Sequence, residues 1–554
     1  MTSSPLLLGP MMRYVDDVSA SIWFETRDAG EVVVTAAGRS WEARTFAVHG
    51  HHYALVHVDG LPPDAALPYT VQIDGTPVWP DPESSLPASV IPTLGSGHPL
   101  RLSFGSCRTS VPHDAEGNRT HGVDALRACA LRLASPDNNV PRPDLILFLG
   151  DQVYADLTTE KMQQFIRARR DMSQPPGKEL ADFEEYAHLY SLAWSDEANR
   201  WLLATVPTAM IFDDHDIRDD WNTSLAWKRD MEATQWWHGR IVAGLASYWV
   251  YQHLGNMSPV ERAADEIWRE IAAHTGETEL DLTARLDAFA DRCDQEPASY
   301  RWSYCRDIND VRLIVVDSRA ARELEPARRA LLDDDETAWL DERMRGGFRH
   351  LLVGTSLPFL LPPGLHHLES WDEAVSQGAW GRPAARVGER LRRLVDLEHW
   401  AAFERSFRQL ARMATEVADG RRGPAPQTVT FLSGDVHYST VSEVQRATGS
   451  RIVQAVCSPI RNPLPIIMRS FSAVLAYTIA TRLAALLARS AGVKSPPFHW
   501  AGVKGPWFDN CLANLEDTPA GLVLKWEKGV VSNGDHGHPL VETVATVTVS
   551  PRPR

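Results

Sequence analysis

The chain has 554 residues, roughly three to four times the ~150 residues expected for one domain. Hydrophobic residues make up 44% and charged residues 23%, which is typical of a soluble globular protein and excludes a disordered, collagen-like or disulfide-stapled chain. The 56 Lys and Arg against 72 Asp and Glu give a net charge of −16, so we expect no nucleic acid as a specific partner. A phosphate substrate is compatible with this charge where local cations, above all metal ions, reverse its sign.

Six cysteines occur without any CxxC pair, a pattern expected in a reducing compartment. The N-terminus has no basic region and only a short apolar run, so no signal peptide is evident and we expect a cytoplasmic protein. The longest apolar stretch, Ile466–Ala488, contains Arg469 and Arg482. The charge-free interval between these arginines is shorter than the ~20 residues that a membrane-spanning helix needs.

The first 80 residues predict a small all-β sandwich domain. Short runs rich in Val, Ile and aromatic residues are separated by turn residues at roughly the 8–12-residue spacing of such sandwiches. These runs are Ser19–Phe24, Glu31–Thr35, Thr45–Val48, His52–His57 and Tyr69–Ile73. A Pro-, Ser- and Gly-rich stretch follows, and we interpret residues 81–99 as a linker.

Residues 100–554 predict a larger α/β domain, in which apolar runs of strand length alternate with helical stretches. The runs are Leu100–Phe104, Leu145–Leu149, Thr208–Phe212, Val311–Val316, His350–Val353 and Val429–Leu432. Residues 227–293 are predicted to be a helical insertion. We interpret its crowded aromatic residues, such as Trp237 and Trp249, as core rather than as substrate contacts.

Five of the predicted strands end in polar clusters. The clusters are Phe104–Arg108, Leu149–Tyr154, Phe212–Asp216, Val353–Ser356 and Leu432–His437. Ligands of such sheets bind outside the carboxyl ends of the strands. Carboxylates, a thiol, a phenol and histidines that converge there are costly unless a positive charge compensates them. A single Asp after a strand is readily explained as a helix cap, but the set together favours a metal site.

These motifs, in this order, resemble the alkaline phosphatase D (PhoD-like) family of the calcineurin-like metallophosphoesterases. The resemblance covers roughly residues 100–530. It implies an α/β fold: a calcineurin-like metallophosphoesterase β-sandwich flanked by helices, preceded by a small all-β sandwich domain. Cys107 replaces the D-x-H motif of the wider superfamily, and Val353–Ser356 stands in place of its lone histidine.

The resemblance implies that Cys107, Asp151, Tyr154 and His437 hold one metal ion. A thiolate, a phenolate and a carboxylate bring high negative charge, which suits Fe³⁺. The alternative is that Cys107 is a buried small hydrophobe and that Tyr154 only bonds to the acidic cluster.

The resemblance also implies that Asp151 bridges to a second metal site, built from Asp214 and Asp435 with Thr355 or Asn222 nearby. Such an all-oxygen set favours Ca²⁺, Mg²⁺ or Mn²⁺ over Zn²⁺. The sequence leaves the identity of this ion open.

Three residues are implied to act on the substrate. His215 would face the leaving-group oxygen, and Asp216 would fix which ring nitrogen of His215 carries the proton. The alternative is that His215 only orients Asp214. Arg108 would clamp the phosphate, or form a salt bridge to the cluster around Asp213. Asp219 and Asp220 are expected to be solvated or to support the ligands.

Two segments farther along are less specific. Asp317 and Arg319 resemble a family Asp-x-Arg segment, and we interpret them as a buried ion pair. Arg461, in a proline-bounded loop, would either reach the substrate or only complete a tight turn.

The sequence therefore predicts a metal-dependent phosphoester hydrolase of the alkaline phosphatase or phosphodiesterase type, acting on a phosphate ester. Monoester or diester preference and oligomeric state stay open. One alternative is a Ca²⁺-dependent phosphodiesterase or phospholipase that acts at membranes. It is suggested by the apolar stretch Pro463–Arg489, which carries arginines. The other interpretation of this stretch is a helix packed in the core. The second alternative is a metal-binding scaffold without catalysis.

Overall fold

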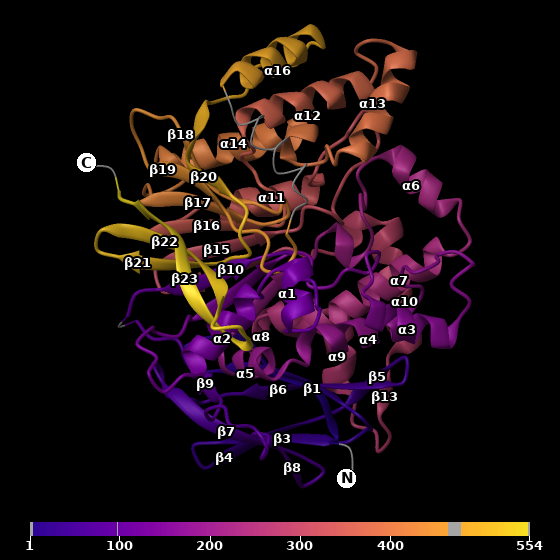
Figure 1. Cartoon of the computed structure of the whole chain (residues 1–554), viewed down its shortest axis with the longest axis vertical. Helices are drawn as coiled ribbons and strands as arrows, with labels where there is room; N and C mark the ends of the chain where they lie inside the picture. The colour runs from indigo at the N-terminus through magenta and orange to yellow at the C-terminus, as the bar shows by residue number, and fades with distance from the viewer. Residues whose placement is uncertain (1–3, 97, 464–477, 552–554) are drawn as a thin grey trace.

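The computed structural model describes residues 4–96, 98–463 and 478–551 (Figure 1). An all-β unit occupies one end of the molecule and a larger α/β body the rest. All six cysteines are free. No helix among the described residues is long and apolar enough to cross a membrane.

The N-terminal unit consists of two sheets packed face to face. One sheet has the order β1 (Leu6–Val15), β2 (Ala20–Thr26), β6 (His51–Val58), β5 (Phe46–Val48) and β13 (Leu280–Asp281). The other has the order β4 (Arg39–Arg44), β3 (Glu31–Ala36), β7 (Ala66–Ile73) and β8 (Thr76–Trp79). Alternate apolar residues of β3 and β7 point inward, and Val34 and Val71 pack with Ile22 of β2 in a common core. The five strands predicted here are confirmed.

Two short strands tie this unit to neighbouring segments. β9 (Val90–Pro92), within the stretch predicted as a linker, pairs with β7. β13, from the predicted helical insertion, pairs in parallel with β5. The N-terminal sandwich therefore includes residues from beyond its predicted end at residue 80.

The α/β body is built on two mixed sheets. The first has the order β12 (Thr208–Ile211), β11 (Leu145–Leu149), β10 (Arg101–Gly105), β21 (Leu512–Thr518), β22 (Gly521–Ser532) and β23 (Asp535–Val549). The second has the order β14 (Tyr304–Ile308), β15 (Val311–Val316), β16 (His350–Thr355), β17 (Thr428–Ser433), β19 (Arg451–Val456), β18 (Ser439–Val444) and β20 (Trp500–Trp507). β10, β11 and β12 are parallel, as are β15, β16, β17 and β19.

The two sheets pack directly on each other. Gly354 of β16 faces β11, where an added Cβ would lie 3.2 Å from the side chains of Leu147 and Leu149. The central strands are buried along their whole length, which explains their unbroken apolar runs. This close contact brings the carboxyl ends of β10, β11 and β17 together.

Helices surround both sheets. The first group is α1 (Ala115–His121), α2 (Ala125–Ala134), α3 (Glu160–Arg169), α4 (Phe183–Trp194) and α5 (Glu197–Thr205). The insertion forms α6 (Leu225–Glu232), α7 (Trp237–Tyr248), η2 (Trp249–His253), α8 (Pro259–Ala264), α9 (Glu266–Ala273) and α10 (Thr283–Gln295), and its aromatic residues Trp237 and Trp249 are core residues, as predicted. The later group is α11 (Asp334–Arg343), α12 (Pro363–Ser376), α13 (Arg382–Leu394), α14 (Glu404–Ala418) and α16 (Thr478–Ser490). Aspartates cap α1, α2, α4, α5, α9 and α11, which accounts for part of the acidic excess.

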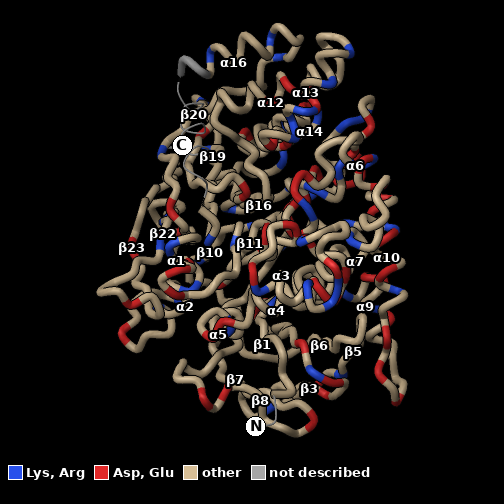
Figure 2. The backbone as a smooth tube through the Cα atoms, turned by 45° about the vertical axis from the view of Figure 1, so that its right-hand side comes forward, with Lys and Arg blue, Asp and Glu red and all other residues tan. Residues whose placement is uncertain are grey.

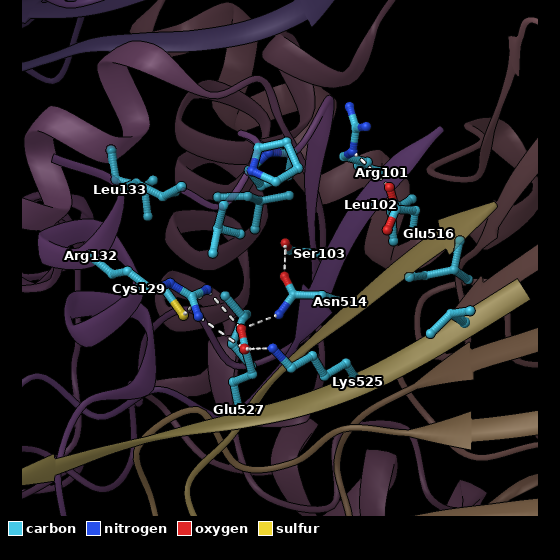
Figure 3. Close-up of a pocket in the computed structure, with 18 residues that line it drawn as sticks. Arg101, Leu102, Ser103, Cys129, Arg132, Leu133, Asn514, Glu516, Lys525 and Glu527 are labelled. Carbon is cyan, nitrogen blue, oxygen red and sulfur yellow. Dashed lines mark hydrogen bonds and ion pairs between the residues drawn. The ribbon is translucent and has the colours of Figure 1, made fainter. Parts of the chain in front are cut away.

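A cavity of about 180 Å³ lies between α2 and strands β10, β21 and β22 (Figure 3). Its main polar group is Glu527, whose carboxylate accepts hydrogen bonds from Arg132 at 2.7 and 2.9 Å and from Asn514 at 2.9 Å. Lys525 forms an ion pair with the same carboxylate. The cavity is lined by the beginning of β10, at the opposite end of this strand from Cys107.

Candidate active site

The polar clusters that follow the parallel strands meet at one edge of the two sheets. Cys107 lies just after β10, Asp151 just after β11, and His437 just after β17. The Cys107 thiol, the Asp151 carboxylate and the His437 imidazole have potential ligand atoms within 4.8 Å of one another. Residues far apart in the sequence thus form one group, with Cys107 and Asp151 buried and His437 half-buried, because their strands end at the same place.

The backbone at these positions is strained. Cys107, Asp151, Asp435 and His437 have φ values of 57°, 50°, 63° and 52°, in the left-handed region that residues other than glycine seldom adopt. Such strain persists only where the surroundings hold it, and it gathers at functional sites. These residues are four of the six predicted metal ligands.

Close contact between the two sheets depends on a glycine. A Cβ at Gly434 would lie 2.1 Å from the Ser106 hydroxyl oxygen and 2.9 Å from the Leu149 carbonyl oxygen. The Ser106 hydroxyl in turn accepts a hydrogen bond from the Asp435 N–H at 3.1 Å. The segment after β17 therefore lies directly against the segment after β10.

Asp151 is the centre of the first group of candidate ligands. Its Oδ2 lies 3.3 Å from the Cys107 Sγ and 3.3 Å from the Tyr154 hydroxyl. Its Oδ1 is buried and has no hydrogen-bond partner among the described residues. A buried carboxylate oxygen without a donor is costly, and a cation would satisfy it.

Protonation in this group depends on a compensating charge. Burial, followed by the Asp151 carboxylate, raises the pKa of the Cys107 thiol well above its usual value, and burial likewise raises that of Tyr154. Burial lowers the pKa of His437 to about 4, so its imidazole is neutral and able to act as a ligand. The thiol and the phenol would ligate only if a cation drives off their protons.

A second group of carboxylates adjoins the first. Asp151, Asp213 and Asp214 have oxygens within 4.8 Å of one another, and all three side chains are buried. Within the part of the chain that the structure describes, Asp213 Oδ2 makes no hydrogen bond, and Asp214 Oδ1 makes none but lies 3.1 Å from Arg319 Nη2. Asp214, predicted as a ligand of the second metal, lies in this group.

Arg319 places a positive charge beside these acids. Its fully buried guanidinium lies 2.5 Å from Asp213 and 2.5 Å from Glu398, and 3.1 Å from Asp214. The buried ion pair predicted for this segment is present, but its partner is Asp213. Asp317 instead accepts backbone N–H groups of the following turn, including that of Arg319.

Asp435, the other predicted ligand of the second metal, binds a histidine that the sequence did not single out. His399 Nε2 lies 2.9 Å from Asp435, and its Nδ1 lies 2.7 Å from the buried Glu369. Burial alone would lower the pKa of His399, but these two carboxylates raise it well above its usual value. Asp435 lies near Arg319, at 3.7 Å, and is oriented by the Glu369–His399 pair.

His215 lies at the mouth of the site with a different partner from the one predicted. Its Nδ1 is 2.9 Å from Asp156, whereas Asp216 accepts hydrogen bonds from the backbone N–H groups of Asp151 and Asp213. The prediction that Asp216 holds the His215 tautomer is therefore wrong, because its carboxylate is turned into the backbone. Burial raises the pKa of Asp216 to about 7.

The two neighbouring aspartates differ in exposure. Asp219 has a side chain that is 58% exposed, and its carboxylate lies 4.0 Å from His215 Nε2. Asp220 is buried, its backbone N–H donates to Asp214 at 3.0 Å, and burial raises the pKa of its carboxyl to about 9. Both aspartates lie next to the predicted ligand Asp214.

Arg108 and Arg461 support loops. Arg108 Nη2 lies 2.8 Å from Asp124, the residue that caps α2, and its Nη1 donates to the Ala193 carbonyl at 2.7 Å. Arg461 donates to several carbonyl oxygens, including that of Val111 at 2.6 Å. Arg108 thus forms a salt bridge to Asp124 and not to the Asp213 cluster. Its donors bind Asp124 and the Ala193 carbonyl, which does not fit the predicted phosphate clamp.

Three comparisons with known proteins bear on this site. A family model described as PhoD-like phosphatase matches residues 132–465, more than half of the chain. The chain belongs to the PhoD-like phosphatase family. A second model, for a domain of unknown function named DUF7800, matches residues 3–91 of the N-terminal unit. The predicted family is thereby confirmed.

The PhoD fold extends over the whole chain. The solved structure of PhoD is similar with a TM-score of 0.59 at 13% identity, covering 99% of this chain and 91% of that one. Two other solved structures have TM-scores too low to indicate a shared fold. The type III pullulan hydrolase from Thermococcus kodakarensis has a TM-score of 0.14 at 10% identity, covering 95% of each chain. The maltogenic amylase from S. marinus has a TM-score of 0.15 at 9% identity, covering 98% of this chain and 81% of that one. A search of curated proteins gave no match.

Some site residues were not found from the sequence. Asp156 lies just beyond the predicted cluster Leu149–Tyr154 after β11, and Glu398 and His399 follow no strand end, so the pattern that indicated the other residues did not include them. Asp156 lies only two positions after Tyr154, and this nearness to a motif was the one available signal. Glu398 and His399 come into the site only through the path of the chain after α13.

Proposed function

We propose that this protein is a metal-dependent phosphoester hydrolase. The observation that carries the proposal is the buried convergence of a thiol, a phenol, carboxylates and a neutral imidazole on strained backbone. Membership of the PhoD-like phosphatase family supports a phosphate ester as the substrate. The alternative of a scaffold without catalysis lacks support, because His215 and its Asp156 partner are both in place beside the ligands.

The donors present fit two metal ions. Cys107, Asp151, Tyr154 and His437 would hold one ion, for which Fe³⁺ is the best match to thiolate and phenolate ligands. Asp151 with Asp213 and Asp214 offers only oxygen donors, which suit Ca²⁺, Mg²⁺ or Mn²⁺. When bound, such ions supply positive charge to phosphoryl oxygens and make water a stronger acid.

His215 is the residue placed to handle a proton. Burial alone would lower its pKa, but Asp156 and Asp214 raise it well above its usual value. Since Asp156 holds Nδ1, the proton available for transfer is at Nε2. We propose that His215 donates this proton to the departing alkoxide.

The surrounding residues keep this arrangement fixed. Asp156 also accepts the backbone N–H of Asp219 at 2.7 Å, which anchors the carboxylate that orients His215. Arg319 offsets the repulsion among Asp213, Asp214 and Glu398. Cys107, Asp151 and Tyr154 are buried, whereas His437 is half-buried, so this side of the site is open to solvent.

Turnover of p-nitrophenyl phosphate and of its bis ester by the purified protein, together with metal analysis, tests this function. We expect hydrolysis that a chelator abolishes, bound iron, and a visible charge-transfer band that Tyr154→Phe shifts or removes. Tyr69→Phe is the matched control, because the hydroxyl of Tyr69, in β7, donates a hydrogen bond to the Ala204 carbonyl of α5 and to no candidate ligand among the described residues. Colourless, fully active protein without iron would contradict the Fe³⁺ assignment, and absence of turnover with either substrate would contradict the function.

A further inference from the structure

Two helices form the end of the molecule opposite the N-terminal sheets. α13 and α16 both pack on α12 (Figure 1). The indole Nε1 of Trp380, just before α13, donates a hydrogen bond to the Ser490 carbonyl at the end of α16, at 3.2 Å. The segment just before α13 thus adjoins the end of α16. We call the exposed sides of α13 and α16, together with Trp380, the docking face.

The docking face exposes large apolar side chains. The described residues include twelve large hydrophobic side chains that are exposed, and five of them lie here: Trp380, Val387, Leu394, Leu483 and Leu486. Leu394 and Leu483 are 79% and 63% exposed. In α16 the opposite side, with Ala484 and Ala488, is buried toward the body, so the leucines point outward. Such clustering on a folded surface indicates an interaction site.

The same face carries arginines without acidic partners. Their side chains are exposed on the outer sides of the two helices: Arg382, Arg386, Arg390, Arg482 and Arg489. None of the five makes an ion pair with any carboxylate in the described part of the chain. The only acidic residue of α13, Glu389, is paired with Arg392 and Arg393, and α16 has no acidic residue.

This local basic charge contrasts with the whole chain, whose net charge is −16. Figure 2 shows Lys and Arg on α13 and α16 at this end of the molecule. On each helix the exposed arginines and apolar residues share the outward side, at three- and four-residue spacing, so cations and apolar side chains are presented together.

We propose that the docking face binds the surface of an anionic lipid bilayer. The arginines would contact lipid phosphates, and Leu483, Leu486 and Leu394 would enter the boundary between headgroups and acyl chains. A lipid surface fits better than a nucleic acid, because exposed leucines gain nothing from a phosphate backbone in water. The proposal does not depend on catalysis, since none of these residues contacts the candidate ligands.

Sedimentation of the full chain with vesicles tests the proposal. We expect binding to phosphatidylcholine vesicles that contain phosphatidylglycerol and not to pure phosphatidylcholine vesicles. Arg386→Ala combined with Arg390→Ala should weaken binding by about fivefold per arginine, as expected for basic residues near an anionic surface. High salt should weaken binding to the same vesicles.

The leucines distinguish a lipid surface from any other polyanion. Leu483→Ser combined with Leu486→Ser should abolish sedimentation, while Leu540→Ser, at another exposed leucine, should leave it unchanged. Both variants change exposed side chains, so folding should be retained, and their melting temperatures check this. Binding that depends on the arginines but not on these leucines, equal binding to pure phosphatidylcholine, or no binding to either vesicle would overturn the proposal.

Discussion

His215 and Asp156 form a pair that joins two of the strand-end clusters. Asp156 follows β11 and His215 follows β12, and the 2.9 Å contact between them fixes which imidazole nitrogen faces the mouth of the site. Neither side chain belongs to the Cys107, Asp151 and His437 group, although His215 forms a further group of potential metal ligands with Asp214 and Asp219. We assign proton transfer to His215 and metal binding to the first group, and substitutions can separate the two roles.

His215→Ala should lower kcat by roughly 10²–10⁴-fold, the usual contribution of a general acid, because it removes the proton at Nε2. The metal content should stay unchanged if His215 acts on a proton as we propose. Its ring lies outside the Cys107, Asp151 and His437 group but inside a further group of potential ligands with Asp214 and Asp219, so metal analysis decides between the two roles. Steady-state kinetics and metal analysis of the same preparation check this. Loss of metal from the variant would show that His215 is itself a ligand.

Asp156→Asn should lower kcat by roughly 10–100-fold, because the residue orients His215 without touching the substrate. Asp219→Asn is the matched control: its carboxylate is mostly exposed and lies 4.0 Å from Nε2. We expect the control to retain nearly full kcat, with folding of both variants checked by thermal melts. Equal losses in the two variants would mean that the assigned partner of His215 is wrong.

The sequence indicated those site residues that follow an apolar strand. Cys107, Asp151 and His437 were found because each lies in the polar cluster that follows such a run, within two to four residues of the strand end. His399 could not be found in this way, since it reaches Asp435 from a segment between α13 and α14. The role of Asp216 was misassigned because adjacency in sequence does not show where a side chain points.

At the scale of the elements, the site depends on how closely two strand ends approach. The turn after β17 lies against the turn after β10, with Gly434 facing Ser106. Since Asp435 and His437 follow Gly434 immediately, any displacement of this turn moves two candidate ligands together. The packing of the sheets and the geometry of the site are thus coupled through one position.

Gly434→Ala should destabilise the protein by about 1–3 kcal/mol, the usual cost of overpacking, because the added methyl group would contact Ser106 and Leu149. Metal content and kcat should fall with it. Gly502→Ala in β20 is the matched control, since nothing lies within 4 Å of a Cβ there. Thermal melts and metal analysis of both variants check this, and equal melting temperatures would contradict the close approach.

The strands were more predictable than their pairing. Central strands such as β11 and β17 are buried throughout, and their apolar runs mark them clearly. β9 and β13 are two or three residues long and carry no such signal, so the sequence did not reveal that they extend the N-terminal sheets. Their pairing depends on tertiary contacts that local propensity does not encode.

At the scale of the whole molecule, histidines of the N-terminal unit bind acids of the α/β body. His51, in β6, lies 3.0 Å from Glu25 of β2 and 2.8 Å from Glu184 of α4. Tyr251 of η2 donates to the same Glu25 at 3.1 Å. His49 pairs with Asp287 of α10 at 2.9 Å, outside this group. The contact between the N-terminal unit and the α/β body therefore includes the imidazole of His51, a side chain whose charge depends on pH.

The contribution of His51 to stability should decrease as pH rises. Burial alone would lower the pKa of His51, but Glu25 and Glu184 raise it above its usual value. A histidine with a raised pKa in the folded state stabilises fully below its unfolded pKa of about 6.5, and this stabilisation is lost as pH rises through the folded value. His51→Gln should therefore cost about 1–2 kcal/mol at mildly acidic pH and much less at mildly alkaline pH. This is below the ~1.5–3 kcal/mol of a hydrogen bond to a charged group, because the Glu184 side chain is 44% exposed.

Melting temperatures of wild type and variant across this range measure the difference. His538→Gln is the control, because this histidine is 77% exposed and pairs only with Asp535 in its own turn. Glu184→Gln should reproduce the pH dependence of His51→Gln, since it removes one of the two carboxylates that favour the charged imidazole. A gap between wild type and His51→Gln that is constant with pH, or that widens toward alkaline pH, would show that His51 contributes by packing and not by its charge.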